Sequence, residues 1–60
     1  MFAERLKQLR KEQKITQSKL AEMFGITQQA VGKWEAGDSS PDPGTLIRLA
    51  ELFGVSVDFL

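Results

Sequence analysis

Apolar residues recur every three or four positions along most of this 60-residue chain. Near its start, Phe2, Leu6 and Leu9 have the spacing that places apolar side chains on one face of a helix. We therefore predict a first helix over residues 2–13. No segment shows the strict alternation of apolar and polar residues that is typical of a half-buried strand. The pattern predicts an all-α fold.

Three later helices are predicted to begin in the same way. Each start has an apolar residue, then a hydroxyl residue, then an apolar residue four positions after the hydroxyl. The pattern occurs in Ile15-Thr16 with Leu20, in Ile26-Thr27 with Val31, and in Val55-Ser56 with Leu60. A hydroxyl at the N-cap accepts a hydrogen bond from a free backbone N–H, and the two apolar residues pack across the first turn. This pattern predicts helices that begin at residues 16, 27 and 56.

Glycine and proline mark the remaining helix boundaries. Gly25, Gly37 and Gly54 follow apolar helical segments, as expected for residues that end helices. Asp42 and Pro43 form an N-cap and first-turn pair after a turn-rich loop. The sequence thus predicts a compact five-helix domain, with helices over residues 2–13, 16–24, 27–36, 42–53 and 56–60.

The second and third predicted helices are joined by a turn of about three residues that contains glycine, which is the helix-turn-helix arrangement. Ala21 is small at the position where the two helices must cross closely. Apolar residues on both sides of the turn have the spacing of an inward face: Leu20, Phe24, Ile26, Val31 and Trp34. An aromatic residue such as Trp34 can also stack on bases, but its position on the apolar face favours the core. We assign Phe2, Phe24, Phe53 and Phe59 to the core as well.

The segment TQSKLAEMFGITQQAVGKWEAG, together with LAELFGVSVDFL at the end, resembles the helix-turn-helix domain of phage repressor and Cro proteins. This family is also named for the xenobiotic response element. The resemblance covers the whole chain and implies a lambda-repressor-like domain that binds double-stranded DNA.

Three side chains of the third predicted helix are candidates for contacts with DNA bases. On a helical wheel, Gln29 and Lys33 lie opposite Val31 and Trp34, and Gln28 lies beside them on the first turn. In a helix-turn-helix, the N-terminal residues of the second helix contact base edges in the major groove. Glutamine can bond adenine N6 and N7, and lysine can bond guanine O6 and N7. The alternative is an ordinary solvated polar face.

Other polar residues are candidates for contacts with DNA phosphates. The resemblance implies that Gln17 bonds a phosphate and braces Gln28, and that Arg10 and Glu35 pair near a phosphate. The free N–H groups at helix starts also suit phosphate. The phosphate candidates are Gln17, Thr16, Thr27, Arg10, Ser39, Ser40 and Lys14. The loop that follows Gly37 departs from many family members, because it is acidic, with two aspartates, where they have lysine or arginine.

The net charge is zero, but its distribution along the chain is uneven. Residues 1–20 hold six basic and two acidic side chains, and residues 21–60 hold two basic and six acidic ones. This imbalance fits either a dipolar surface or ordinary solvated helix faces.

Cysteine and histidine are absent, which excludes disulfides, the usual zinc sites and Ser-His-Asp triads. We expect no enzyme activity, no metal, no cofactor and no small-molecule substrate. No apolar run approaches the roughly 20 residues of a membrane span, so we expect no membrane association and a cytoplasmic protein.

We expect residues 1–60 to form a single domain, either alone or as the N-terminal part of a longer regulator. The predicted function is sequence-specific DNA binding by a bacterial or phage transcriptional regulator that acts as a repressor. The alternative, favoured by the acidic loop and zero net charge, is a protein-interaction module such as an antitoxin or a regulator-assembly domain. The resemblance implies a dimer contact at Val57, Asp58 and Leu60. A weak homodimer would bind a roughly palindromic operator whose half-sites lie about 34 Å apart.

Overall fold

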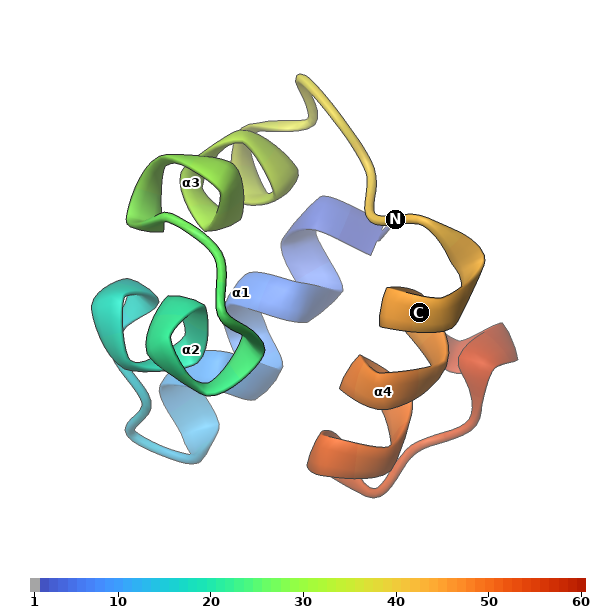
Figure 1. The fold of residues 1–60 in the computed structure, drawn as a ribbon. Coiled ribbons are helices and arrows are strands. Elements are labelled where there is room, and N and C mark those ends of the chain that lie inside the picture. Colours follow the sequence, from blue (N-terminus) through green and yellow to red (C-terminus); the bar gives the residue numbers. More distant parts are fainter. Residues whose placement is uncertain (1) are drawn as a thin grey trace.

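A computed structural model describes residues 2–60 of the chain. It contains four α-helices and one 3-10 helix: α1 (Phe2–Glu12), α2 (Gln17–Phe24), α3 (Gln28–Ala36), α4 (Pro43–Phe53) and η1 (Val57–Phe59). Figure 1 shows α2 and α3 in front of α1, with α4 on the other side of the molecule. No strand occurs in the described residues, which confirms the predicted all-α fold.

Hydroxyl residues cap three of the helix starts, as predicted. The Thr16 hydroxyl accepts from the Lys19 backbone N–H at 3.0 Å, and the Thr27 hydroxyl accepts from that of Ala30 at 3.1 Å. Ser56 caps η1 in the same way, at 3.2 Å from the Phe59 nitrogen. The cap residues themselves have extended backbones. The helices therefore begin one residue later than predicted.

The start of α4 uses a different bond. Asp42 is extended and precedes Pro43 at the first helical position, as predicted. Its carboxylate accepts from the Thr45 hydroxyl at 2.6 Å rather than from a backbone N–H. This hydrogen bond lowers the pKa of Asp42 below its ordinary value.

The backbone turns left-handed after each of the four α-helices in residues 2–60, at a glycine in three cases and at a lysine in one. Gly25 ends α2 with φ 67°, and the Ile26 nitrogen bonds the Ala21 carbonyl oxygen at 3.0 Å. After α1, Lys14 takes the same left-handed conformation with φ 58°, and the Ile15 nitrogen bonds the Arg10 carbonyl oxygen at 3.0 Å. A lysine in this region carries a steric cost that glycine avoids.

The predicted fifth α-helix is wrong. Residues 57–59 form a 3-10 helix, in which each hydrogen bond spans three residues instead of four. The Phe59 N–H donates to the Ser56 carbonyl oxygen, and the Leu60 N–H donates to the Val57 carbonyl oxygen. The first turn of an α-helix must order several residues to form one hydrogen bond. A short 3-10 turn forms its first hydrogen bond with fewer ordered residues.

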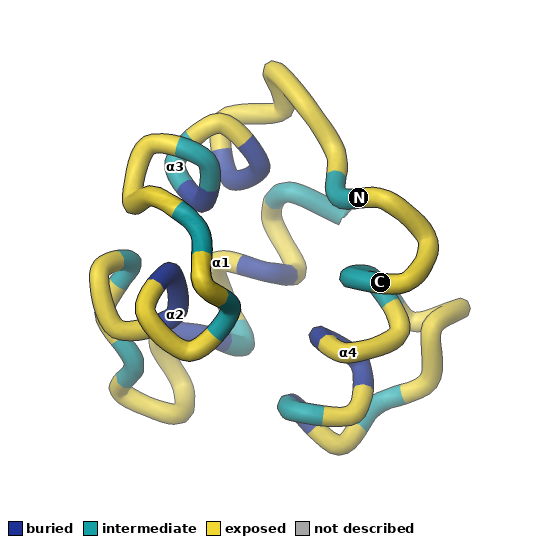
Figure 2. The backbone as a smooth tube through the Cα atoms, viewed as in Figure 1, coloured by how far each residue is buried: buried dark blue, intermediate teal, exposed yellow. Residues whose placement is uncertain are grey.

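The core is formed by the inner faces of all four α-helices, as the dark segments in Figure 2 show. The buried apolar residues are Leu6, Leu20, Ala21, Val31, Trp34, Leu49, Ala50 and Phe53. Trp34 is only 7% exposed, which confirms its assignment to the core. The assignment of Phe59 to the core is wrong, because this side chain is 44% exposed. It belongs to η1, which packs beside α4 rather than over the centre.

The helix-turn-helix lies at one side of the fold. Helices α2 and α3 pack directly on each other, and α3 also packs on α1. This arrangement brings the first turn of α2 next to the first turn of α3. In residues 2–60, no helix is long and apolar enough to cross a membrane.

Candidate nucleic-acid interface

The first turns of α3 present polar side chains to solvent. Gln28, Gln29 and Lys33 are all exposed. They lie on the outer side of α3 because Val31 and Trp34 on its opposite side are buried. The three predicted base-contacting residues therefore share one accessible region of the helix.

Behind this region, a buried ion pair joins α1 to α3. Arg10 donates from Nε to Glu35 Oε2 at 2.6 Å and from Nη2 to Glu35 Oε1 at 3.0 Å. The two side chains are 11% and 2% exposed. Arg10 Nη1 also donates to the carbonyl oxygen of Ile15 at 2.9 Å. The pair implied by the resemblance is thus present, and it also fixes the connection that leads into α2.

The surroundings of Glu35 keep it ionised. Burial raises the pKa of the Glu35 carboxyl, but the hydrogen bonds from Arg10 and Gln17, together with the positive charges of Arg10 and Lys7, outweigh burial and lower it. The net effect places the pKa of Glu35 below its ordinary value. The hydrogen bond to Glu35 also raises the pKa of Arg10. Both groups are charged near neutral pH, so Glu35 acts only as a hydrogen-bond acceptor.

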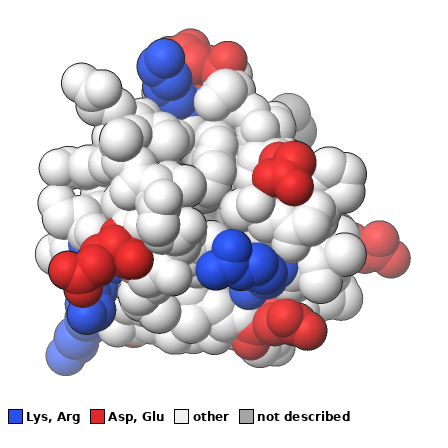
Figure 3. Space-filling view, viewed as in Figure 1, with Lys and Arg blue, Asp and Glu red and all other residues white. Residues whose placement is uncertain are grey.

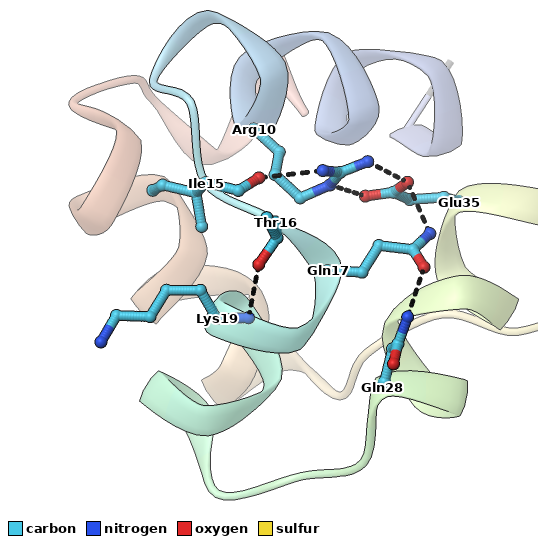
Figure 4. Close-up of polar contacts among 7 residues, drawn as sticks. All are labelled: Arg10, Ile15, Thr16, Gln17, Lys19, Gln28 and Glu35. Carbon is cyan, nitrogen blue, oxygen red and sulfur yellow. Dashed lines mark hydrogen bonds and ion pairs between the residues drawn. The ribbon is translucent and has the colours of Figure 1, made fainter.

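Gln17 extends this pair towards the surface (Figure 4). Its Nε2 donates to Glu35 Oε1 at 3.1 Å. Its Oε1 accepts from Gln28 Nε2 at 3.5 Å. A chain of polar contacts therefore runs from buried Arg10, through Glu35 and Gln17, to the exposed amide of Gln28.

Ser18 adds a contact that we did not predict from the sequence. Its hydroxyl donates to Gln28 Oε1 at 3.0 Å. Ser18 lies within α2, one residue past Gln17, and has no capping role that would mark it in the sequence. Its contact depends on how closely α2 and α3 approach each other. Together, Ser18 and Gln17 contact both polar atoms of the Gln28 amide.

The phosphate candidates differ in how accessible they are. Most of them are exposed: Thr16, Thr27, Ser39, Ser40 and Lys14. Thr16 and Thr27 accept cap bonds through their oxygens, which leaves each O–H free to donate. Gln17 is half-buried, and one of its two amide hydrogens bonds Glu35. Arg10 is buried against Glu35 and Ile15. Its geometry therefore suits support of the neighbouring side chains rather than direct contact with a phosphate.

Charged groups of both signs are scattered over the face that Figure 3 shows. Basic and acidic side chains lie next to each other in several places, and no continuous patch of lysine and arginine is visible on that face. The excess of basic residues in the first 20 residues therefore does not produce a basic surface on that face.

The predicted dimer residues are divided between surface and interior. Val57 is 39% exposed and Asp58 is exposed, but Leu60 is half-buried and packs against the core. Phe59 contributes exposed apolar surface instead. Arg5 of α1 holds this segment, because it donates to the Phe59 carbonyl oxygen and lies 5.2 Å from the centre of the Phe59 ring.

Comparisons with known proteins agree with this arrangement. A family model described as helix-turn-helix matches residues 6–60. The SPbeta prophage-derived uncharacterized HTH-type transcriptional regulator YonR of Bacillus subtilis is 47% identical over 60 residues, covering 100% of this chain and 56% of that protein. The HTH-type transcriptional activator BcrR of Enterococcus faecalis is 37% identical over 98% of this chain and 29% of its own length. The repressor protein C2 of Salmonella phage P22 is 32% identical over 100% of this chain and 28% of its own length.

The chain spans about half the length of the first of these relatives. The P22 repressor confirms the resemblance to phage repressors that the sequence motifs indicated. With the family match over residues 6–60 and two packed helices joined by a short glycine-containing turn, the chain belongs to the helix-turn-helix family of DNA-binding transcriptional regulators.

Proposed function

We propose that this domain binds double-stranded DNA sequence-specifically, with α3 in the major groove and Gln28, Gln29 and Lys33 in contact with base edges. The observation that supports this most directly is the exposed polar region at the start of α3, whose Gln28 accepts a hydrogen bond from Ser18 and donates one to Gln17 of α2. A side chain whose function is only solvation needs no such support. A side chain that distinguishes bases benefits from an orientation fixed before binding.

Each of these residues suits a particular base. The glutamine amide has a donor and an acceptor side by side, which match N7 and N6 of adenine. The Lys33 ammonium is a donor only and matches the two acceptors of guanine. The N-termini of α2 and α3 lie nearby and have free backbone N–H groups that attract phosphate.

Mostly neutral groups make the backbone contacts in this proposal. The hydroxyls of Thr16 and Thr27 and the second amide hydrogen of Gln17 are directed to phosphates, with Ser39, Ser40 and Lys14 as further contacts. Neutral donors hold the protein on the DNA backbone without counterion release. The domain should therefore have a shallower salt dependence than a strongly basic DNA-binding domain.

The domain acts as a repressor that binds as a dimer to a roughly palindromic operator. Repression by occupancy of a promoter requires only tight DNA binding, which a domain of this size can supply. The dimer contact is formed by Val57 and Asp58 of η1, with Leu60 supporting them from inside. The exposed apolar area there is small, so the dimer is weak in the absence of DNA.

Selection of bound sites from a random duplex pool tests the proposal. The expected result is an enriched sequence with two related half-sites about one helical turn apart. Titration of the selected site against a scrambled duplex, at two salt concentrations, then separates specific from general binding. If no sequence is enriched and the domain has no salt-sensitive affinity for DNA, the proposal fails. The protein-interaction alternative, which the exposed Asp38 and Asp42 favour, would then take its place.

A further inference from the structure

We propose that Ser18 is a positioning residue that fixes the direction of the Gln28 amide, and that buried Glu35 sets the polarity of the hydrogen bonds leading to it. This inference rests on the proposed function, because it concerns which atoms of Gln28 face a base. The family resemblance alone already implies that Gln17 braces Gln28. The role of Ser18 and the polarity of the whole chain of contacts come from the structure.

The polarity starts at Glu35. An ionised carboxylate only accepts hydrogen bonds, so the atom of Gln17 that contacts it at 3.1 Å must be the Nε2 donor. Gln17 therefore directs its Oε1 acceptor outwards. An acceptor in that position requires a donor from Gln28, which is its Nε2 at 3.5 Å. Each amide group is thus restricted to one of its two flipped orientations.

Ser18 supplies the second contact on Gln28. With Nε2 turned to Gln17, the Oε1 of Gln28 meets the Ser18 hydroxyl at 3.0 Å. This bond is shorter than the one between Gln28 and Gln17. Ser18 is therefore the stronger constraint on the amide. A serine hydroxyl can donate or accept, so it adapts to the polarity set from Glu35 but does not determine it.

The orientation determines what Gln28 offers to DNA. One hydrogen on Nε2 and one lone pair on Oε1 remain after the two contacts within the protein. Together they form the donor and acceptor pair that fits adenine. In the opposite flip, donor and acceptor would exchange places relative to α3. Loss of the Ser18 bond would let the amide rotate, so discrimination at that base pair would fall.

The experiment compares Ser18→Ala, Ser18→Thr, Gln28→Ala and the double variant Ser18→Ala/Gln28→Ala. Base preference is measured by competition between the selected site and versions changed one base pair at a time. Ser18→Ala should reduce discrimination between about threefold and tenfold at the base pair affected by Gln28→Ala, which corresponds to one hydrogen bond. Ser18→Thr, which keeps the hydroxyl, should retain it. In the double variant, Ser18→Ala should add nothing to the effect of Gln28→Ala.

A measurement without DNA tests the same contact. The order parameter of the Gln28 side-chain Nε2, from 15N relaxation, should fall in Ser18→Ala and be kept in Ser18→Thr, with Gln29 Nε2 as an internal reference. An unchanged order parameter in Ser18→Ala would overturn the positioning role.

The two proposals fail in different ways. If Gln28→Ala changes base preference and Ser18→Ala does not, the positioning role is wrong and DNA recognition by Gln28 stands. If Gln28→Ala leaves base preference unchanged while Ser18→Ala lowers the order parameter, Ser18 positions the amide but Gln28 does not distinguish bases. That last result overturns the base contact in the proposed function.

Discussion

Arg10 and Glu35 form a two-point ion pair, with N–O distances of 2.6 and 3.0 Å, that ties α1 to α3 behind the candidate interface. Both side chains are almost fully enclosed. Among residues 2–60, no buried side-chain N or O atom is left without a hydrogen-bond partner. The pair is therefore a fully satisfied polar centre within an apolar core, and loss of either member leaves an uncompensated charge.

Arg10→Met should destabilise the domain severely. Removal of one partner from a buried ion pair costs about 3–5 kcal/mol, because the remaining charge stays buried. The whole domain, at roughly 0.05–0.15 kcal/mol per residue, is stabilised by only about 3–9 kcal/mol. Urea denaturation followed by Trp34 fluorescence measures the loss. Arg10→Met/Glu35→Met removes both charges and should recover part of the stability. A single variant as stable as the parent would contradict the structural role of the pair.

Acid should weaken the fold partly through Glu35. Its folded pKa is lowered, so its contribution to stability is fully present above the ordinary glutamate value of about 4.3 and is lost as pH falls through the folded pKa. Denaturation at several pH values between 7 and 3 should therefore show that the free energy of unfolding falls more steeply with falling pH for the parent than for Glu35→Gln. Parallel curves for the two proteins would show that Glu35 does not contribute to acid sensitivity.

The helix starts were predictable because capping is local. Thr16 and Thr27 bond backbone N–H groups three residues away, so a short sequence pattern contains all the information needed. The burial of Trp34 followed from helical spacing for the same reason. The contact between Ser18 and Gln28 was not predictable, since it joins residues on two helices and depends on how those helices pack.

Two further features had no sequence signal. The left-handed turn after α1 is formed by Lys14, although such positions usually contain glycine. The outward position of Phe59 follows from the 3-10 turn of η1, whereas the sequence analysis assigned this aromatic side chain to the core.

Lys14→Gly should stabilise the domain. A non-glycine residue in the left-handed region costs about 1–2 kcal/mol, and glycine loses about 0.5–1 kcal/mol through its greater freedom when unfolded. The expected net gain is about 0.5–1 kcal/mol in the free energy of unfolding. Gly25→Ala is the matched control, because Gly25 has nearly the same φ and the change should be destabilising. A loss of stability in Lys14→Gly would show that the lysine side chain contributes more than its backbone strain costs.

Gln29→Ala and Lys33→Ala should each change base preference at one position of the operator half-site. Loss of a base contact costs about 1–3 kcal/mol on the preferred sequence and little on random DNA. Competition binding between selected and scrambled duplexes measures both quantities. Ser40→Ala serves as the control, because loss of a phosphate contact should weaken binding to all sequences alike. Equal losses on both duplexes for Gln29→Ala and Lys33→Ala would contradict their role in base recognition.

Val57→Asp should weaken self-association without unfolding the domain. Val57 is 39% exposed, so the change removes apolar surface that is already in contact with water and adds a charge beside Asp58. On an operator with two half-sites, loss of the dimer contact should reduce affinity and abolish cooperativity, while affinity for one half-site is kept. Sedimentation equilibrium and titration of one-site and two-site duplexes measure these effects. Met23→Asp on α2 is the matched control, because Met23 is 41% exposed and lies outside η1. If Met23→Asp reduced self-association and Val57→Asp did not, the dimer contact would lie on a different face from η1.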